Sequence, residues 1–137
     1  MKAKTTSIWH GNFKDGKGSI VAEHSALHSI VYKPNKKADE KTATNPDELL
    51  GAAHSSCYNM TLNYYLTEAG YSIDFLETSV VITDKNKVIT NIDLMVTGKV
   101  HDITNDLFKQ FAEKAKAGCP VGNLLKIEAS LTASLQQ

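Results

Sequence analysis

The chain contains two cysteines, Cys57 and Cys119, and they are the residues best suited to covalent or redox chemistry. Cys119 directly precedes Pro120, a place where a short helix can begin. Backbone N–H groups at a helix start stabilise a thiolate, which predicts that Cys119 is the more acidic thiol. Cys57 lies within a long apolar segment, where a cysteine is often only a small buried residue. The residue types alone leave redox chemistry and simple packing both open.

A histidine accompanies one of the cysteines. His54 lies three residues before Cys57, so on a helix the two side chains share one face, about 5 Å apart. Such a pair could supply the nucleophile and the base of a thiol hydrolase. However, no glycine-bounded turn presents Cys57 at an exposed elbow. The remaining histidines lack metal-ligand spacing with each other or with the cysteines, so no zinc site is expected.

A long helix is expected to carry Cys57. Asn45 can cap its start, a proline occupies the first turn, and the two acidic residues that follow suit the positive end of a helix. The helix should span about Pro46–Ala69 and stop at Gly70. It is apolar on most sides, which predicts a central helix rather than a surface one.

Strand patterns and two shorter helices surround this segment. Alternating or β-branched runs indicate strands at Ser7–His10, Ser19–Glu23, Ala26–Lys33, Ser72–Ile82, Val88–Val100 and Ile127–Leu135. Helices are expected over Thr104–Ala117 and from Cys119 to about Leu125, and the polar segment Pro34–Thr44 predicts an exposed loop. This order of elements predicts a single α+β domain over residues 1–137.

The composition, 42% hydrophobic and 22% charged residues, is that of an ordinary globular protein. Fifteen basic and fifteen acidic residues cancel, which removes the electrostatic reason to expect nucleic acid or a membrane surface as a partner. The N-terminal lysines are not followed by an apolar stretch, so no secretory signal is expected. We therefore expect a cytoplasmic protein, in which cysteines are more often reactive than bridged.

Two cysteine-bearing segments resemble the OsmC/Ohr family of thiol peroxidases. TNPDELLGAAHSSC, which ends at Cys57, resembles the helix-opening signature of that family. KAKAGCPVGNLLKIEASL, which contains Cys119, is similar to its second cysteine segment. WHGNFKDGKG and the Tyr32–Asn35 region resemble the OsmC branch, so the resemblance covers nearly the whole chain.

The resemblance implies an α+β fold in which antiparallel sheets pack around a long central helix, in an intertwined homodimer with active sites at the subunit interface. It implies that Cys57 attacks an organic hydroperoxide and becomes a sulfenic acid. Cys119 would then close a disulfide, which an external dithiol, lipoyl-linked for many relatives, reopens. No metal, flavin or haem is implied. The attack by Cys57 rests on the resemblance, because the helix start favours Cys119.

Two residues of the family pattern are replaced. Relatives activate the attacking thiol with an arginine from the N-terminal half and a glutamate beside the helix-opening proline, and this chain contains no arginine. Counting back from TNP assigns Lys37 to the arginine position and Asp47 to the glutamate position, with Glu48 adjacent. Lysine keeps the charge but lacks the planar fork of arginine. A repacked site, a substitute such as Lys36 or Lys41, and weakened activity all stay open.

The expected helix also bears on assembly and on rival functions. On a continuous helix Asp47 and Cys57 are about 15 Å apart along the axis and about 80° apart around it. A carboxylate that acts on Cys57 would then come from a second chain, in agreement with an obligate dimer. Two rivals remain: a non-enzymatic dimer that senses oxidant through the same disulfide, and a Cys–His hydrolase that depends on His54.

Overall fold

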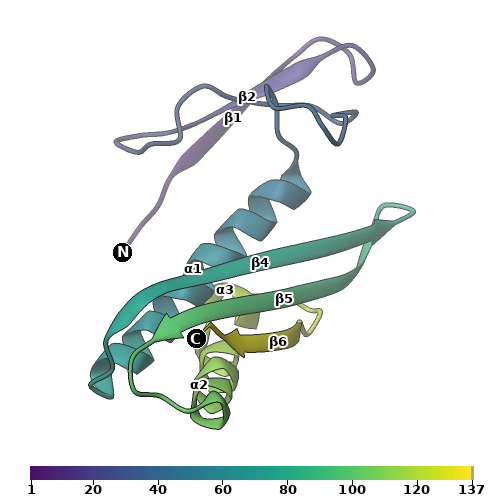
Figure 1. The fold of residues 1–137 in the computed structure, drawn as a ribbon. Coiled ribbons are helices and arrows are strands. Elements are labelled where there is room, and N and C mark those ends of the chain that lie inside the picture. Colours follow the sequence, from purple (N-terminus) through teal and green to yellow (C-terminus); the bar gives the residue numbers. More distant parts are fainter. Residues whose placement is uncertain (137) are drawn as a thin grey trace. The chain divides into compact units, whose positions relative to one another are not determined.

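The structure, a computed structural model, describes residues 1–136 and consists of two compact units, Met1–Leu49 and a second unit that begins at Leu50. We describe each unit by itself (Figure 1). The elements in chain order are β1 (Thr5–His10), β2 (Lys17–Ala22), β3 (Ile30–Tyr32), α1 (Pro46–Glu68), β4 (Ile73–Lys85), β5 (Val88–Val100), α2 (Asn105–Gly118), α3 (Pro120–Leu124) and β6 (Ser130–Leu135). The α+β class is confirmed, and the single domain over the whole chain stays a prediction.

The first unit is built on the antiparallel sheet β1-β2-β3. Alternate residues of β2 are buried, whereas β1 is exposed along its whole length. The strand expected at Ala26–Lys33 is reduced to the three residues of β3, because the left-handed backbone of Ser29 (φ 54°) interrupts the extended chain just before it.

Helix α1 begins and ends close to the predicted residues. The backbone N–H of Glu48 donates to Asn45 Oδ1 at 2.9 Å, as the predicted cap requires. Gly70 follows the helix with φ +89°, the left-handed conformation that favours glycine. The capping box is only half formed, because the Glu48 carboxylate accepts a hydrogen bond from the Thr44 hydroxyl at 2.8 Å.

The second unit contains the sheet β4-β5-β6. A hairpin joins β4 and β5, and its tip residues Asn86 and Lys87 have the positive φ values that a tight turn requires. β6 pairs parallel to β5, which corrects the expectation of antiparallel sheets throughout. The parallel pairing is possible because α2 and α3 carry the chain back from the end of β5 before β6 begins.

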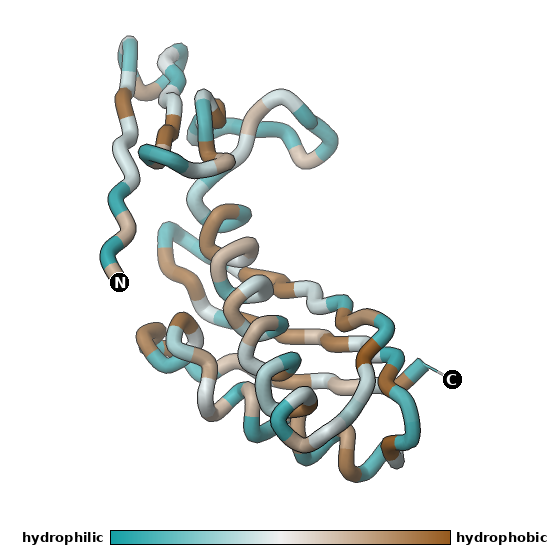
Figure 2. Tube along the Cα trace, turned by 90° about the vertical axis from the view of Figure 1, so that its left-hand side faces the viewer, coloured by the Kyte–Doolittle hydropathy of each residue, from teal (hydrophilic) through white to brown (hydrophobic). Residues whose placement is uncertain are grey.

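The core of the second unit lies between this sheet and two helices (Figure 2). Buried residues alternate along β5, and α2 contributes Phe108. Helix α1 buries one stripe, Gly51, His54, Tyr58, Leu62 and Leu66. Its other side is exposed, Met60 and Tyr64 included, so within one chain only this stripe of the apolar helix is buried. Among the described residues, no helix has the length and apolarity needed to cross a membrane.

Candidate active site

Cys57 lies in the middle of α1 at the border between its buried and its exposed side. Its side chain is half-buried and packs against the core cluster that contains Tyr58 and Leu62. This placement differs from the fully buried position that the apolar sequence around it suggests. A half-exposed thiol can meet a molecule from solvent while the core holds its helix in place.

Cys119 occupies the turn between α2 and α3 and is only 1% exposed. It is the N-cap of α3, with a proline at the first helical position, as the sequence predicts. Burial raises the pKa of the Cys119 thiol, the backbone N–H groups of Gly122 and Val121 act to lower it, and the neighbouring Cys57 raises it further. The expectation that Cys119 is the acidic thiol is therefore wrong, because loss of solvent outweighs the helix start.

The structure brings the two cysteines together within the second unit. Both are free thiols, and Cys57 lies close enough to Cys119 to raise the pKa of the Cys119 thiol. Cys119 belongs to the buried core, and Cys57 packs against the same cluster from α1. The two thiols therefore border the same part of the core.

In the first unit, Lys36 and Glu48 form an ion pair. The Nζ of Lys36 lies 3.1 Å from Glu48 Oε2 and donates to the carbonyl of Lys37, also at 3.1 Å. The Lys36 side chain is 6% exposed, although the sequence predicts a solvated loop. The hydroxyl of Thr44 and the ammonium of Lys36 both lower the pKa of the Glu48 carboxyl. Glu48 is thus held as an anion beside a buried lysine.

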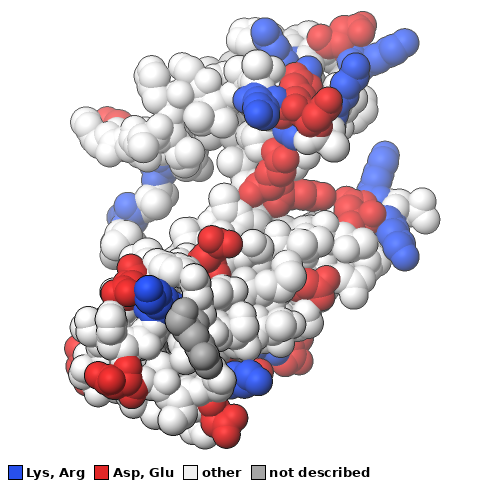
Figure 3. All heavy atoms as spheres, viewed as in Figure 1, with Lys and Arg blue, Asp and Glu red and all other residues white. Residues whose placement is uncertain are grey.

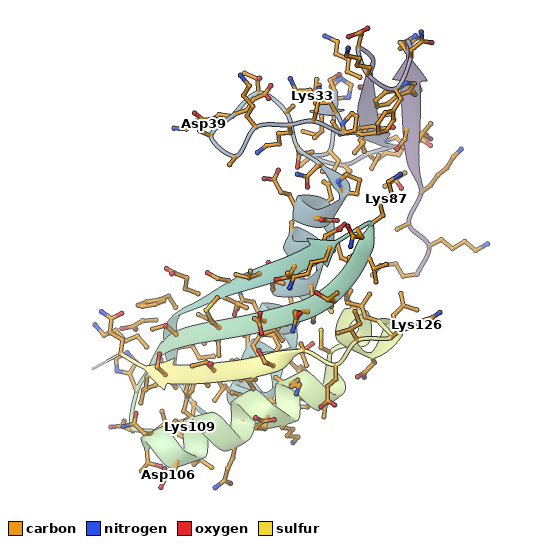
Figure 4. All side chains as sticks on the ribbon, turned by 90° about the vertical axis from the view of Figure 1, so that its right-hand side faces the viewer. Lys33, Asp39, Lys87, Asp106, Lys109 and Lys126 are labelled. Atoms are coloured by element: carbon orange, nitrogen blue, oxygen red, sulfur yellow. The ribbon has the colours of Figure 1, made fainter. Side chains whose placement is uncertain are left out.

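The residues assigned from the family pattern are one position away from this pair. The side chain of Lys37 is exposed, and its backbone N–H donates to Glu40 Oε2 at 3.4 Å. Asp47 is half-buried. Glu40 also pairs with Lys33 at 2.7 Å, and Lys33 and Asp39 mark the loop in Figure 4. The contact with the carboxylate therefore belongs to Lys36, and the roles of Lys37 and Asp47 stay predictions.

The surface charge is mixed. Acidic and basic side chains are interspersed over the face drawn in Figure 3, with no large area of one sign on it. Within residues 1–136, no three histidine, cysteine, aspartate or glutamate side chains gather closely enough to hold a metal ion.

His54 is the residue whose surroundings the sequence did not reveal. It is 2% exposed, its Nδ1 has no hydrogen-bond partner among the described residues, and burial lowers the pKa of the imidazole. Among the described residues no hydrogen bond joins it to Cys57. Its Nε2 instead faces Gly122, beside Cys119. The only sequence signal was the spacing from Cys57, which suggested the wrong partner.

Comparison with known proteins identifies the family of the chain. The family model described as "OsmC-like protein" matches residues 38–134. The chain belongs to this OsmC family. "Peroxiredoxin OsmC" of Escherichia coli (strain K12) is 36% identical over 137 residues, which cover 97% of this chain and 96% of that protein. "Organic hydroperoxide resistance protein OhrB" of Bacillus subtilis (strain 168) is 24% identical over 105 residues, covering 75% and 77%.

Solved structures agree with the family at the level of the fold. The OsmC like protein from Mycoplasma pneumoniae superposes with a TM-score of 0.82 at 16% identity, covering 100% of this chain and 99% of the other. OhrB of Bacillus subtilis gives a TM-score of 0.70 at 21% identity, covering 99% and 98%. The resemblance read from the sequence is confirmed, and with it the OsmC-like fold.

Proposed function

We propose that the chain is a thiol-dependent peroxidase that reduces organic hydroperoxides to alcohols with Cys57 and Cys119. The observation that carries the proposal is the pair of neighbouring free thiols, one half-exposed and one buried. The exposed member can meet a substrate, and the buried member is protected from direct oxidation. The names of the family relatives, a peroxiredoxin and an organic hydroperoxide resistance protein, support the same activity.

The proposed reaction has three steps. The Cys57 thiolate attacks the terminal peroxide oxygen, the O–O bond breaks, and the alkoxide takes a proton to leave as an alcohol. Cys57 is now a sulfenic acid. The Cys119 sulfur attacks the Cys57 sulfur, the S–O bond breaks, and water leaves as the disulfide forms. An external dithiol then restores both thiols by exchange.

The activation of Cys57 is assigned to the loop of residues 33–41. A thiol in the middle of a helix receives little help from the helix dipole, so a cation has to favour the thiolate. The Lys36–Glu48 pair favours Lys36 over Lys37 for this role, because Glu48 holds that ammonium in place. Since α1 is continuous, Asp47 or Glu48 lies about 14 to 15 Å along the helix from Cys57. The pair would therefore serve Cys57 of a second subunit.

A homodimer is proposed on further grounds. β1 is exposed along its whole length, and the first unit also exposes Ile8, Trp9 and Phe13. In the second unit, α1 exposes Met60 and Tyr64. A strand without a buried face is stabilised too little to persist alone, so a second copy that covers these residues is expected.

The proposed dimer can be tested by the mass of the protein in solution. Sedimentation at micromolar concentration should give twice the 15.0 kDa of one chain, because each subunit needs its partner to cover β1 and the exposed side of α1. Met60→Lys should weaken the dimer, whereas Lys109→Met, on the exposed part of α2 (Figure 4), should leave the mass unchanged. A fully active monomer would exclude the shared-site arrangement.

The activity itself is tested by turnover. With dihydrolipoamide as reductant, the protein should consume many equivalents of cumene hydroperoxide and prefer it to hydrogen peroxide; a monothiol is the comparison reductant. One equivalent of peroxide without reductant should block both cysteines, and mass spectrometry should identify a Cys57–Cys119 disulfide. Consumption that stops after one equivalent with every thiol would indicate a sensor. Two freely alkylated cysteines would reject the mechanism.

A further inference from the structure

A cavity of about 350 Å³ lies in the second unit and is lined in part by His54. Charged side chains of both signs surround it: Glu113, Lys116, Lys126 and Glu128. Lys126 follows α3 (Figure 4), and Glu128, which is 87% exposed, pairs with Lys116 at 3.2 Å. The cavity therefore connects a buried imidazole with solvent through a polar mouth.

On its other side His54 faces the buried cysteine. A methyl group on Gly122 would lie 3.0 Å from His54 Nε2, 3.7 Å from Cys119 Cβ and 3.8 Å from Cys119 Sγ. The imidazole nitrogen and the thiol thus border the same small gap, which exists because residue 122 has no side chain. A gap of this size is crossed by one water molecule or by a small rotation of the ring.

Closure of the disulfide requires the buried Cys119 thiol to lose its proton. The backbone N–H groups of Gly122 and Val121 are donors and cannot accept it. Tyr58 donates its hydroxyl to the carbonyl of Ala112 at 2.9 Å, and burial raises the pKa of that hydroxyl. His54 has a nitrogen lone pair available, since burial lowers the pKa of its imidazole and keeps it neutral.

We infer that His54 is the base that removes the Cys119 proton across the Gly122 gap as the disulfide closes. This inference rests on the two-cysteine function proposed above. The Cys119 sulfur forms the bond to Cys57 and its proton moves to His54, while the group bound to the Cys57 sulfur leaves with the bonding electron pair. For the sulfenic acid this group is hydroxide, which becomes water when His54 returns the proton. Exchange with solvent runs through the cavity.

The closing step can be measured without peroxide. An aromatic disulfide such as dithiobis(nitrobenzoic acid) loads the half-exposed Cys57 and releases one coloured thiol. Attack by Cys119 then releases a second coloured thiol, so one absorbance trace records loading and closure as separate phases. A loss of folding alters both phases, whereas loss of the base alters only the second. The same variants treated with hydroperoxide report whether sulfenic acid forms at all, which tests the peroxidase proposal independently.

His54→Gln, which keeps a polar atom near the Nε2 position, should slow closure about 100-fold at neutral pH, a typical loss for a general base. Wild-type closure should change little between about pH 7 and 9, whereas closure in His54→Gln should rise about ten-fold per pH unit, because Cys119 must then ionise unaided. The charged groups that line the cavity with His54 are Glu113, Lys116, Lys126 and Glu128, and the titratable group across the Gly122 gap is Cys119. Lys116→Gln and Lys126→Gln therefore test whether the pH dependence of closure comes from these charged side chains at the mouth of the cavity rather than from His54.

Two further variants separate a base from a packing residue. Gly122→Ala fills the gap and should slow closure at least about ten-fold although the imidazole is intact. His54→Ala should recover closure when imidazole is added, because the cavity leads to the vacated site. The matched control is His101→Gln, because His101 is an exposed histidine that pairs with Asp74. In this variant the disulfide should close at the wild-type rate.

The outcomes that overturn the inference are distinct. Wild-type closure with an unchanged pH profile in His54→Gln would remove His54 from the step. Slower closure with the wild-type pH profile and without rescue by imidazole would show that His54 acts only as a packing residue. If the variants behave as expected with the aromatic disulfide but no sulfenic acid forms with hydroperoxide, the peroxidase proposal fails while the role of His54 stands.

Discussion

Cys57→Ser is expected to abolish peroxide reduction, because no other thiol of the chain can be reached from solvent. Cys119 is 1% exposed, and burial raises its pKa, so it is neither accessible nor ionised at neutral pH. The loss should reach the background rate of peroxide with free reductant. Hydroperoxide consumption is measured with dihydrolipoamide in excess.

Cys119→Ser is the matched variant and should fail in a different way. It should consume about one equivalent of hydroperoxide and then stall as a Cys57 sulfenic acid, which a small monothiol can rescue. A dimedone adduct on Cys57, detected by mass spectrometry, identifies that state. If Cys119→Ser rather than Cys57→Ser loses the first equivalent, the roles of the two thiols are reversed.

Lys36→Met is expected to slow the oxidation of Cys57 at least about ten-fold, equivalent to about 1.4 kcal/mol of lost transition-state stabilisation. The reason is the loss of a buried ammonium that Glu48 holds in place at 3.1 Å. Lys36→Arg should retain or improve the rate, since the guanidinium restores a planar fork toward carboxylate and thiolate. The second-order rate of Cys57 oxidation is compared from about pH 5 to 9.

Lys37→Met provides the control, because it removes the same charge from the neighbouring, exposed position. It should react within about two-fold of the wild type, as is usual for an exposed side chain. Glu48→Gln should slow the oxidation of Cys57 as Lys36→Met does, whereas Asp47→Asn should leave the rate unchanged. The reverse ranking, with Lys37 and Asp47 as the sensitive pair, would restore the assignment made by counting from the family motif. Wild-type rates for all four would leave the loop without a part in activation.

Local signals in the sequence were enough to define the long helix and the family. Asn45 and Gly70 mark the ends of α1 because capping and the left-handed glycine depend on a few consecutive residues. The alternation along Val88–Val100 predicted β5 with the observed bounds. The two cysteine segments identified the family without any coordinates, and the family match confirms them.

The chemistry of the individual side chains depended on contacts that no local pattern records. Whether Cys119 is acidic is decided by the burial that packing against α1 and α2 imposes, and this outweighs the helix start that the sequence shows. Whether Lys36 or Lys37 meets the carboxylate depends on the path of an irregular loop, in which the side chain of Lys36 is buried and that of Lys37 is exposed.

The sequence by itself determined that the chain is an α+β member of the OsmC family and that it has two cysteines. Only the tertiary structure decided that Cys57 is the reachable thiol, that Cys119 is the buried one, and that His54 and Cys119 share the gap at Gly122. The physical reason is that backbone conformation follows neighbours in the chain. Solvent exposure, proton affinity and proximity follow neighbours in space, and α1 and α3 contribute these residues from distant parts of the sequence.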